Sequence, residues 1–228
     1  MEHTISLALV DFIPVVFSAI GVVLIARMIA QLHLTSGQVA YVAAALIALG
    51  GLSKAGWKLI IASTGNDIVW LDELLFIFLG SGFTLMSWAL WNARLVLSGQ
   101  EVPRTIWLRP LAVIALFGGG AIAARLAQPE ARYWVYILLM LTTFANLAVG
   151  ILLIRQARQQ SLRLAAAFFL FNLIAIIALS GMARVPEQTI ALQWIEELIN
   201  VLAQGAFAIA AWQLVTAVAG SPSVVAAT

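Results

Sequence analysis

Seven acidic and lysine side chains lie inside strongly apolar stretches of this sequence. They form two acidic pairs, a lysine pair and a single aspartate, namely Asp72-Glu73, Glu196-Glu197, Lys54, Lys58 and Asp11. Ionisable groups inside a bilayer are costly and usually mark a path for ions, protons or solutes. Two neighbouring carboxylates can bind a cation when ionised, or pass a proton that they share. These residues therefore indicate a site for an ion, a proton or a small solute.

The sequence predicts a binding site from six of the polar residues, which are Glu73, Glu197, Lys54, Lys58, Asn200 and Gln204. In this hypothesis Glu73 faces Glu197, and the two lysines, four residues apart on one helical face, are their positive partners. Asn200 and Gln204 follow Glu197 at helical spacing and continue a polar stripe toward mid-membrane. The alternative is that these carboxylates and lysines lie near helix ends and reach the headgroup water.

Composition excludes several classes of site. The chain of 228 residues has no cysteine and two histidines, His3 and His33. Thiolate metal sites, iron–sulfur clusters, bis-histidine haems and histidine-based proteases are therefore excluded, and the sequence identifies no metal site and no cofactor. No lysine follows Lys58, so a retinal Schiff base in a seventh helix is also excluded. Gly118-Gly119-Gly120 follows no strand and precedes no lysine, so it predicts close packing or flexing rather than a phosphate loop.

The elements that carry these residues are expected to be membrane helices. Apolar residues make up 63% of the chain and charged residues 10%, against about 25% charged in soluble domains. A helix spans the bilayer with about 20 mostly apolar residues. Seven stretches meet this condition: Leu7–Ala30, Gln38–Ile61, Ile68–Ala93, Trp107–Leu126, Tyr133–Ile154, Leu162–Ala183 and Ile190–Ala217. We therefore predict an all-α integral membrane protein, a single domain over residues 1–228.

The distribution of positive charges predicts the orientation. One side of the membrane would hold seven arginines, at positions 27, 94, 104, 109, 155, 158 and 163. The other would hold Lys54, Lys58, Arg125, Arg132 and Arg184. Because short cytoplasmic loops are enriched in lysine and arginine, the N-terminus is expected outside and the C-terminus in the cytoplasm. The predicted location is a plasma or inner cell membrane.

An internal repeat is indicated by the third and seventh stretches. Aligning Trp70–Leu90 with Trp194–Leu214 gives six identities in 21 positions, including two tryptophans and Glu73 over Glu197. We predict a parallel 3+1+3 plan, with repeats at 7–93 and 133–217 and a linker helix at 107–126. Parallel repeats occur among transporters. The plan resembles that of SWEET sugar exporters and of vitamin-precursor carriers, although none of their residue motifs is present, so the resemblance concerns architecture alone.

Three functions of different class are consistent with the sequence. The first is a carrier for a small solute or ion, coupled to protons or ions, with its site between the third and seventh stretches. The second is a sensory or accessory subunit of a larger membrane complex. The third is a membrane-embedded lipid-modifying enzyme, for which no catalytic motif is present. The expected partners are the lipid bilayer, a small-molecule or ion ligand, and either further copies of the chain or a larger complex; nothing indicates nucleic acid.

Overall fold

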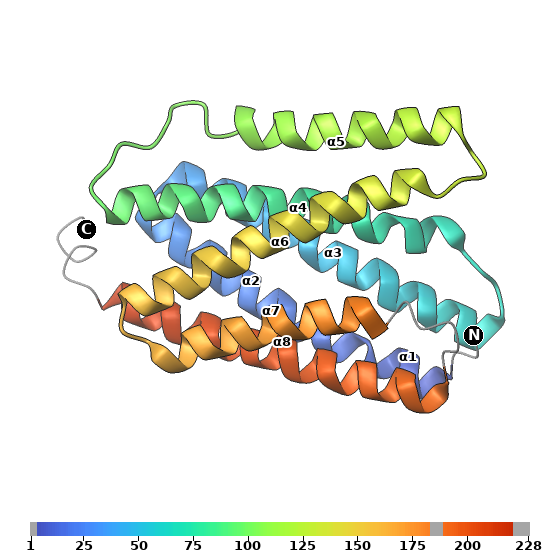
Figure 1. The fold of residues 1–228 in the computed structure, drawn as a ribbon. Helices are drawn as coiled ribbons and strands as arrows, with labels where there is room; N and C mark the ends of the chain where they lie inside the picture. Colours follow the sequence, from blue (N-terminus) through green and yellow to red (C-terminus); the bar gives the residue numbers. More distant parts are fainter. Residues whose placement is uncertain (1–3, 183–188, 221–228) are drawn as a thin grey trace.

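The computed structural model describes residues 4–182 and 189–220 as a bundle of helices (Figure 1). The helices are α1 (Ile5–Val10), α2 (Phe12–Leu32), α3 (Leu34–Thr64), α4 (Val69–Leu97), α5 (Leu108–Ala127), α6 (Tyr133–Gln159), α7 (Arg163–Met182) and α8 (Ile190–Ala219). With α1 and α2 counted together, seven helices of the described part of the chain are long and apolar enough to cross a membrane. This confirms the seven predicted spans, and by length and composition the chain is a polytopic membrane protein. The predicted break around residue 185 and Arg184 lie outside the described residues.

The first predicted helix is divided in two at Asp11. Its carboxylate lies where α1 ends and α2 begins, at a turn of the chain. Pro14 follows three residues later and has no N–H to donate to the carbonyl of Val10. The break therefore has a local cause in the sequence. It is slight, because Asp11 keeps right-handed helical backbone angles (φ −55°, ψ −24°) and Ile5–Leu32 together form one span.

Helix ends follow ordinary capping chemistry, which moves one boundary from its predicted place. Thr4 and Thr189 cap α1 and α8 by accepting bonds from backbone N–H groups three residues later. The ring of His33 accepts a bond from the N–H of Ser36 at 3.2 Å. Because of this cap, α3 begins at Leu34 rather than at the predicted Gln38. Gly65, at a φ of 72°, ends α3 in the left-handed conformation that favours glycine.

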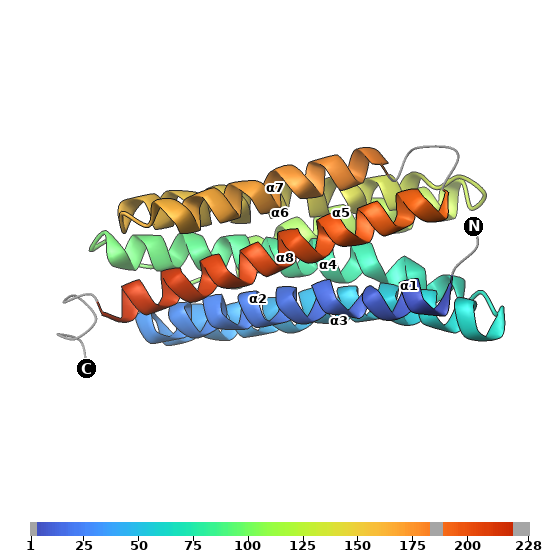
Figure 2. The ribbon, with the colours of Figure 1, turned by 90° about the horizontal axis from the view of Figure 1, so that it is seen from below.

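Six of the spans form a closed ring. Going around it, α2 packs on α3, α3 on α4, α4 on α6, α6 on α7, α7 on α8, and α8 again on α2. Helix α5 lies outside this ring against α6 and α4, as the two perpendicular views show (Figures 1 and 2). Side chains on the outward faces are largely apolar, as expected for contact with lipid.

Small residues bring the ring helices close together. A Cβ added at Gly82 would lie 2.7 Å from Ile47 Cγ1, and one at Gly21 would lie 2.5 Å from the ring of Phe207. One at Gly80 would lie 3.1 Å from the Thr142 hydroxyl on α6. The glycines of α4 therefore serve close helix packing, as small residues commonly do in membranes. In contrast, a Cβ at Gly118 or Gly119 would meet no described atom within 4 Å, so the expected close packing there is not formed.

Charges of opposite sign collect at opposite ends of the bundle. Of the eight acidic residues within the described ranges, seven lie at the end of the bundle where α1 begins, and only Glu101 lies at the other. We call these the acidic end and the arginine-rich end. The arginine-rich end holds all seven arginines predicted to face the cytoplasm. The structure therefore groups these arginines at one end, as the orientation prediction assumes. The orientation itself stays a prediction.

The order of helices around the ring is compatible with the predicted duplication. Helices α2, α3 and α4 are followed by α6, α7 and α8, with α5 as the outer linker. Six helices that follow one another around a ring would show this order whether or not the chain arose by duplication. The internal repeat therefore stays a prediction.

Candidate functional site

The central feature of the acidic end is an ammonium group between two carboxylates. Lys58 Nζ, on α3, lies 2.6 Å from Asp11 Oδ2 and 3.0 Å from Glu197 Oε1 on α8. It donates a hydrogen bond to Glu197. Because both oxygens contact the same nitrogen, the two carboxylates are close neighbours. We call Asp11, Lys58 and Glu197 the Lys58 cluster.

The Lys58 cluster is shielded from the surroundings of the bundle. The side chains of Asp11 and Glu197 are 9% and 8% exposed, and that of Lys58 is 20% exposed. Glu197 Oε2 is buried without a hydrogen-bond partner among the described residues. One helical turn earlier on α8, Gln193 is also buried, and both polar atoms of its amide are without a described partner. The cluster and the neighbouring Gln193 therefore retain hydrogen-bonding capacity that the described residues do not satisfy.

A second ion pair lies one helical turn away on α3. Lys54 Nζ contacts Asp72 Oδ1 at 2.5 Å and lies 4.3 Å from the ring centre of Trp57. About a third of the Lys54 side chain and a quarter of the Asp72 side chain are exposed. The structure thus places Lys54 near Lys58, as the four-residue spacing predicts, but in a separate and more exposed pair. This pair fits the interfacial interpretation.

Glu73 lies apart from the Lys58 cluster. It accepts a hydrogen bond from Arg125 on α5 at 3.2 Å, and Arg125 also stacks over Trp134. No hydrogen bond joins Glu73 to Glu197 within the described part of the chain. The reason is the ring order, because α4 packs on α3, α5 and α6, whereas α8 packs on α2 and α7. The expected pairing of the two glutamates is therefore replaced by a Glu197–Lys58 pair between α8 and α3.

The polar stripe below Glu197 leads to a small cavity in the middle of the bundle. Asn200 is partly buried, and Gln204, two turns below Glu197, lines a cavity of about 40 Å³. Ser18, Asn146 and Asn172 contribute further polar groups to its wall. A cavity needs roughly 10–15 Å³ to hold one water molecule. This one therefore has room for water or for a small ion at the level of mid-membrane.

Sequence reasoning assigned Lys58 and Glu197 to the site and left Asp11 and Gln193 outside it. Two signals could have included them. Pro14 three residues after Asp11 indicates a broken helix, and broken membrane helices often form ion sites. Gln193 precedes Glu197 by four residues and so shares its helical face.

The chain matches no protein-family model, no curated protein and no solved structure at a significant level. Its function is therefore inferred from the geometry of the site.

Proposed function

We propose that this protein is a membrane carrier in which the movement of a small solute or ion is coupled to binding of a proton or a monovalent cation at the Lys58 cluster. The observation that supports this proposal is the buried Asp11–Lys58–Glu197 arrangement, in which two carboxylates share a single ammonium group. A purely structural ion pair needs only one carboxylate for each lysine.

The charge balance of the cluster favours binding of one positive charge. With all three groups ionised, Asp11, Lys58 and Glu197 carry a net charge of −1. An uncompensated charge is costly in a buried setting, because the surroundings solvate it poorly. Addition of one proton or one monovalent cation would make the cluster neutral. Glu197 Oε2, which has no described partner, is the atom best placed to accept it.

The position of the cluster supports coupling to a conformational change. Its three residues belong to different elements, the break between α1 and α2, helix α3 and helix α8. A change in charge would therefore alter the attraction between three helices of the ring at once. A polar stripe on α8 leads from Glu197 through Asn200 to Gln204 at the central cavity, and Ser18, seven residues after Asp11, lines the same cavity from α2. Seven residues correspond to about 10 Å of helix.

Proton-coupled transport can be tested in vesicles of purified protein that contain a pH-sensitive dye. An imposed pH gradient, with a potassium diffusion potential to offset charge movement, should produce protein-dependent acidification of the lumen. Glu197→Gln should abolish this flux while the protein keeps its elution profile. Glu73→Gln is the matched control, because Glu73 pairs with the exposed Arg125 instead, and it should transport normally.

A sodium gradient in place of the proton gradient tests coupling to a monovalent cation. Equal flux in empty vesicles and in vesicles with wild-type protein, under both gradients, would contradict passage of protons or monovalent cations through the protein. Normal flux in Glu197→Gln would keep the carrier but remove the Lys58 cluster from its mechanism.

A further inference from the structure

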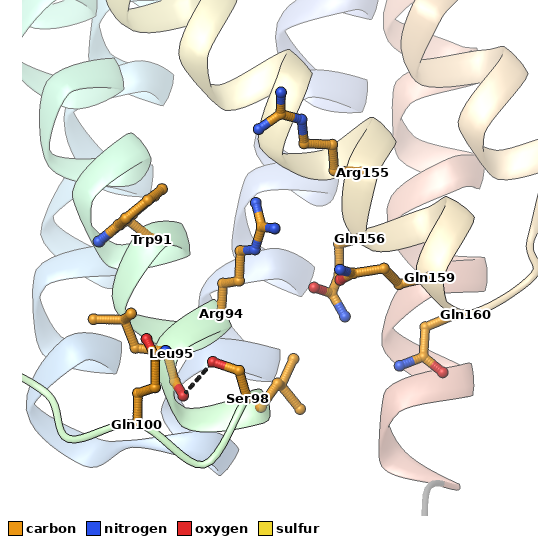
Figure 3. Close-up of a pocket in the computed structure, with 10 residues that line it drawn as sticks. Trp91, Arg94, Leu95, Ser98, Gln100, Arg155, Gln156, Gln159 and Gln160 are labelled. Atoms are coloured by element: carbon orange, nitrogen blue, oxygen red, sulfur yellow. Dashed lines mark hydrogen bonds between the residues drawn. The ribbon is translucent and has the colours of Figure 1, made fainter.

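The arginine-rich end contains a polar cleft between the C-terminal ends of α4 and α6. Its volume is about 630 Å³, within the range of about 300–1,000 Å³ typical of small-molecule sites. Arg94 from α4 and Arg155 from α6 extend into the space between the two helices (Figure 3). Gln156 and Gln159 line the same space and add amide donors.

The two arginines of this cleft pair with no carboxylate of the described residues. Among the described residues, Arg94 and Arg155 form no ion pair, and the only acidic residue described at this end is Glu101. At the acidic end, by contrast, Lys54, Lys58 and Arg125 all contact carboxylates. Guanidinium groups bind phosphate and carboxylate through paired hydrogen bonds. The cleft therefore has the donors and the charge for an anionic group.

A mostly apolar groove, with Arg109 in its wall stacked over Trp88, lies along the same helices nearer their middle. It has a volume of about 290 Å³ and lies between α4, α5 and α6, with Trp88, Val113, Phe117 and Phe144 in its wall. The groove and the cleft use the same helix faces. On α4, Trp88 in the groove lies three residues before Trp91 in the cleft. On α6, Ala145 in the groove lies eleven residues, or three helical turns, before Gln156 in the cleft.

The groove lies between two contacts of α5: Arg109 stacks over Trp88 of α4 toward the arginine-rich end, and the other contact is at the acidic end. There Ala121 packs with Trp134, Val135 and Leu138 of α6. Toward the arginine-rich end α6 runs away from α5 (Figure 1), and Val113 on α5 remains 41% exposed. The groove thus faces the region that lipid chains occupy.

We propose that the cleft and the groove together bind an anionic phospholipid, with its phosphate group at Arg94 and Arg155 and one acyl chain between α4, α5 and α6. The order of the two parts matches this ligand, since the charged cleft lies at the end of the helices and the apolar groove lies deeper. Thr84 in the groove and Arg94 in the cleft are ten residues apart, about 15 Å along α4. That is half of the roughly 30 Å hydrocarbon core, the depth of one lipid leaflet. This site does not depend on the proposed carrier function.

Lipid titration of the purified full chain in an uncharged detergent tests the proposal. Bound lipid is counted by native mass spectrometry, and the melting temperature is followed in parallel. Phosphatidylglycerol should bind and raise the melting temperature, whereas phosphatidylcholine with the same chains and inorganic phosphate should do so far less. The double variant Arg94→Gln/Arg155→Gln should need at least about tenfold more phosphatidylglycerol for the same occupancy.

The matched control is Arg158→Gln/Arg163→Gln, which removes two charges at the same end from arginines that do not line the cleft. It should bind phosphatidylglycerol as the wild type does. Equal weakening in both double variants would mean a general surface charge and would overturn the site. A full effect with inorganic phosphate alone would mean an anion site without a lipid.

A variant of the groove keeps the test decisive if the arginine variant does not fold. Val113→Trp places a large ring in the groove from the partly exposed side of α5. It should weaken binding of phosphatidylglycerol and leave any binding of inorganic phosphate unchanged. Unchanged binding of phosphatidylglycerol in Val113→Trp would remove the acyl chain from the groove and overturn the proposal.

Discussion

Lys58 Nζ lies 3.0 Å from Glu197 Oε1, although 139 residues separate the two in the sequence. The contact joins α3 to α8, and the second carboxylate on the same ammonium group, Asp11, belongs to the break between α1 and α2. The first two helices and the last helix are thus joined through the largely buried side chain of Lys58. The stability of this corner of the ring and the proposed ion site depend on the same three side chains.

The first prediction concerns removal of that lysine. Lys58→Met would leave Asp11 and Glu197 buried without a positive partner, and loss of one member of a buried ion pair costs about 3–5 kcal/mol. We expect a marked loss of unfolding free energy at neutral pH, measured by denaturation in mixed detergent micelles. Acidic buffer should restore part of the loss, because protonation removes the uncompensated negative charge.

Lys54→Met is the matched control on the same helix face. Its partner Asp72 is about a quarter exposed, and ion pairs with such access to solvent contribute about 0–1 kcal/mol. The control should therefore lose little stability, and its loss should depend only weakly on pH. Equal losses in the two variants would contradict a special role of the Lys58 cluster in stability.

The sequence was sufficient for the number and approximate place of the spans. Runs of about 20 apolar residues allow no other interpretation in a chain with so few charges. Boundaries depend on local chemistry, and the break at Asp11 was missed because apolar content continues across it on both sides. The start of α3 was also predicted too late in the sequence, because the ring of His33 caps this helix where a serine or threonine side chain is usual.

The candidate site was only partly predictable. A sequence indicates how far along its helix a residue lies better than it indicates which neighbouring helix the side chain faces. Lys58, Glu73 and Glu197 all lie near the same end of the bundle, as their positions along the helices imply. Which pair meets depends on the order of helices around the ring, and that order places α8 beside α2 and away from α4. The 124-residue correspondence between Glu73 and Glu197 carries no information on this point.

The second prediction compares two glycines in membrane helices. Gly82→Ala places a methyl group 2.7 Å from Ile47 and 3.1 Å from the carbonyl of Ala43 on α3. Such overpacking should destabilise the protein by about 1–3 kcal/mol. Gly118→Ala meets no described atom within 4 Å, so it should be neutral or stabilising by up to about 1 kcal/mol through helix propensity. Melting temperatures of the two variants in the same detergent compare them directly, and the opposite ranking would contradict the close α3–α4 contact.

The third prediction is the orientation of the chain in the membrane. The native protein has no cysteine, so single cysteines can be introduced without a background. Asn66→Cys, between α3 and α4, should react with an impermeant maleimide added to intact cells. Glu101→Cys, between α4 and α5, should react only after the membrane is made permeable. The reverse pattern would place the arginine-rich end outside and contradict the positive-inside assignment.

The last prediction concerns the polar stripe between the Lys58 cluster and the central cavity. Gln204 lies two turns below Glu197 and lines the cavity with Ser18 and Asn172. Gln204→Leu keeps a similar volume but removes the amide, so water or an ion in the cavity loses one of its polar contacts. We expect flux in the vesicle assay to fall at least about tenfold while the melting temperature is kept. The control is Thr216→Val on the same helix, since the Thr216 hydroxyl bonds only to carbonyls of its own helix among the described residues. Wild-type flux in Gln204→Leu would exclude this stripe from the transport path and leave the Lys58 cluster to be tested by Glu197→Gln.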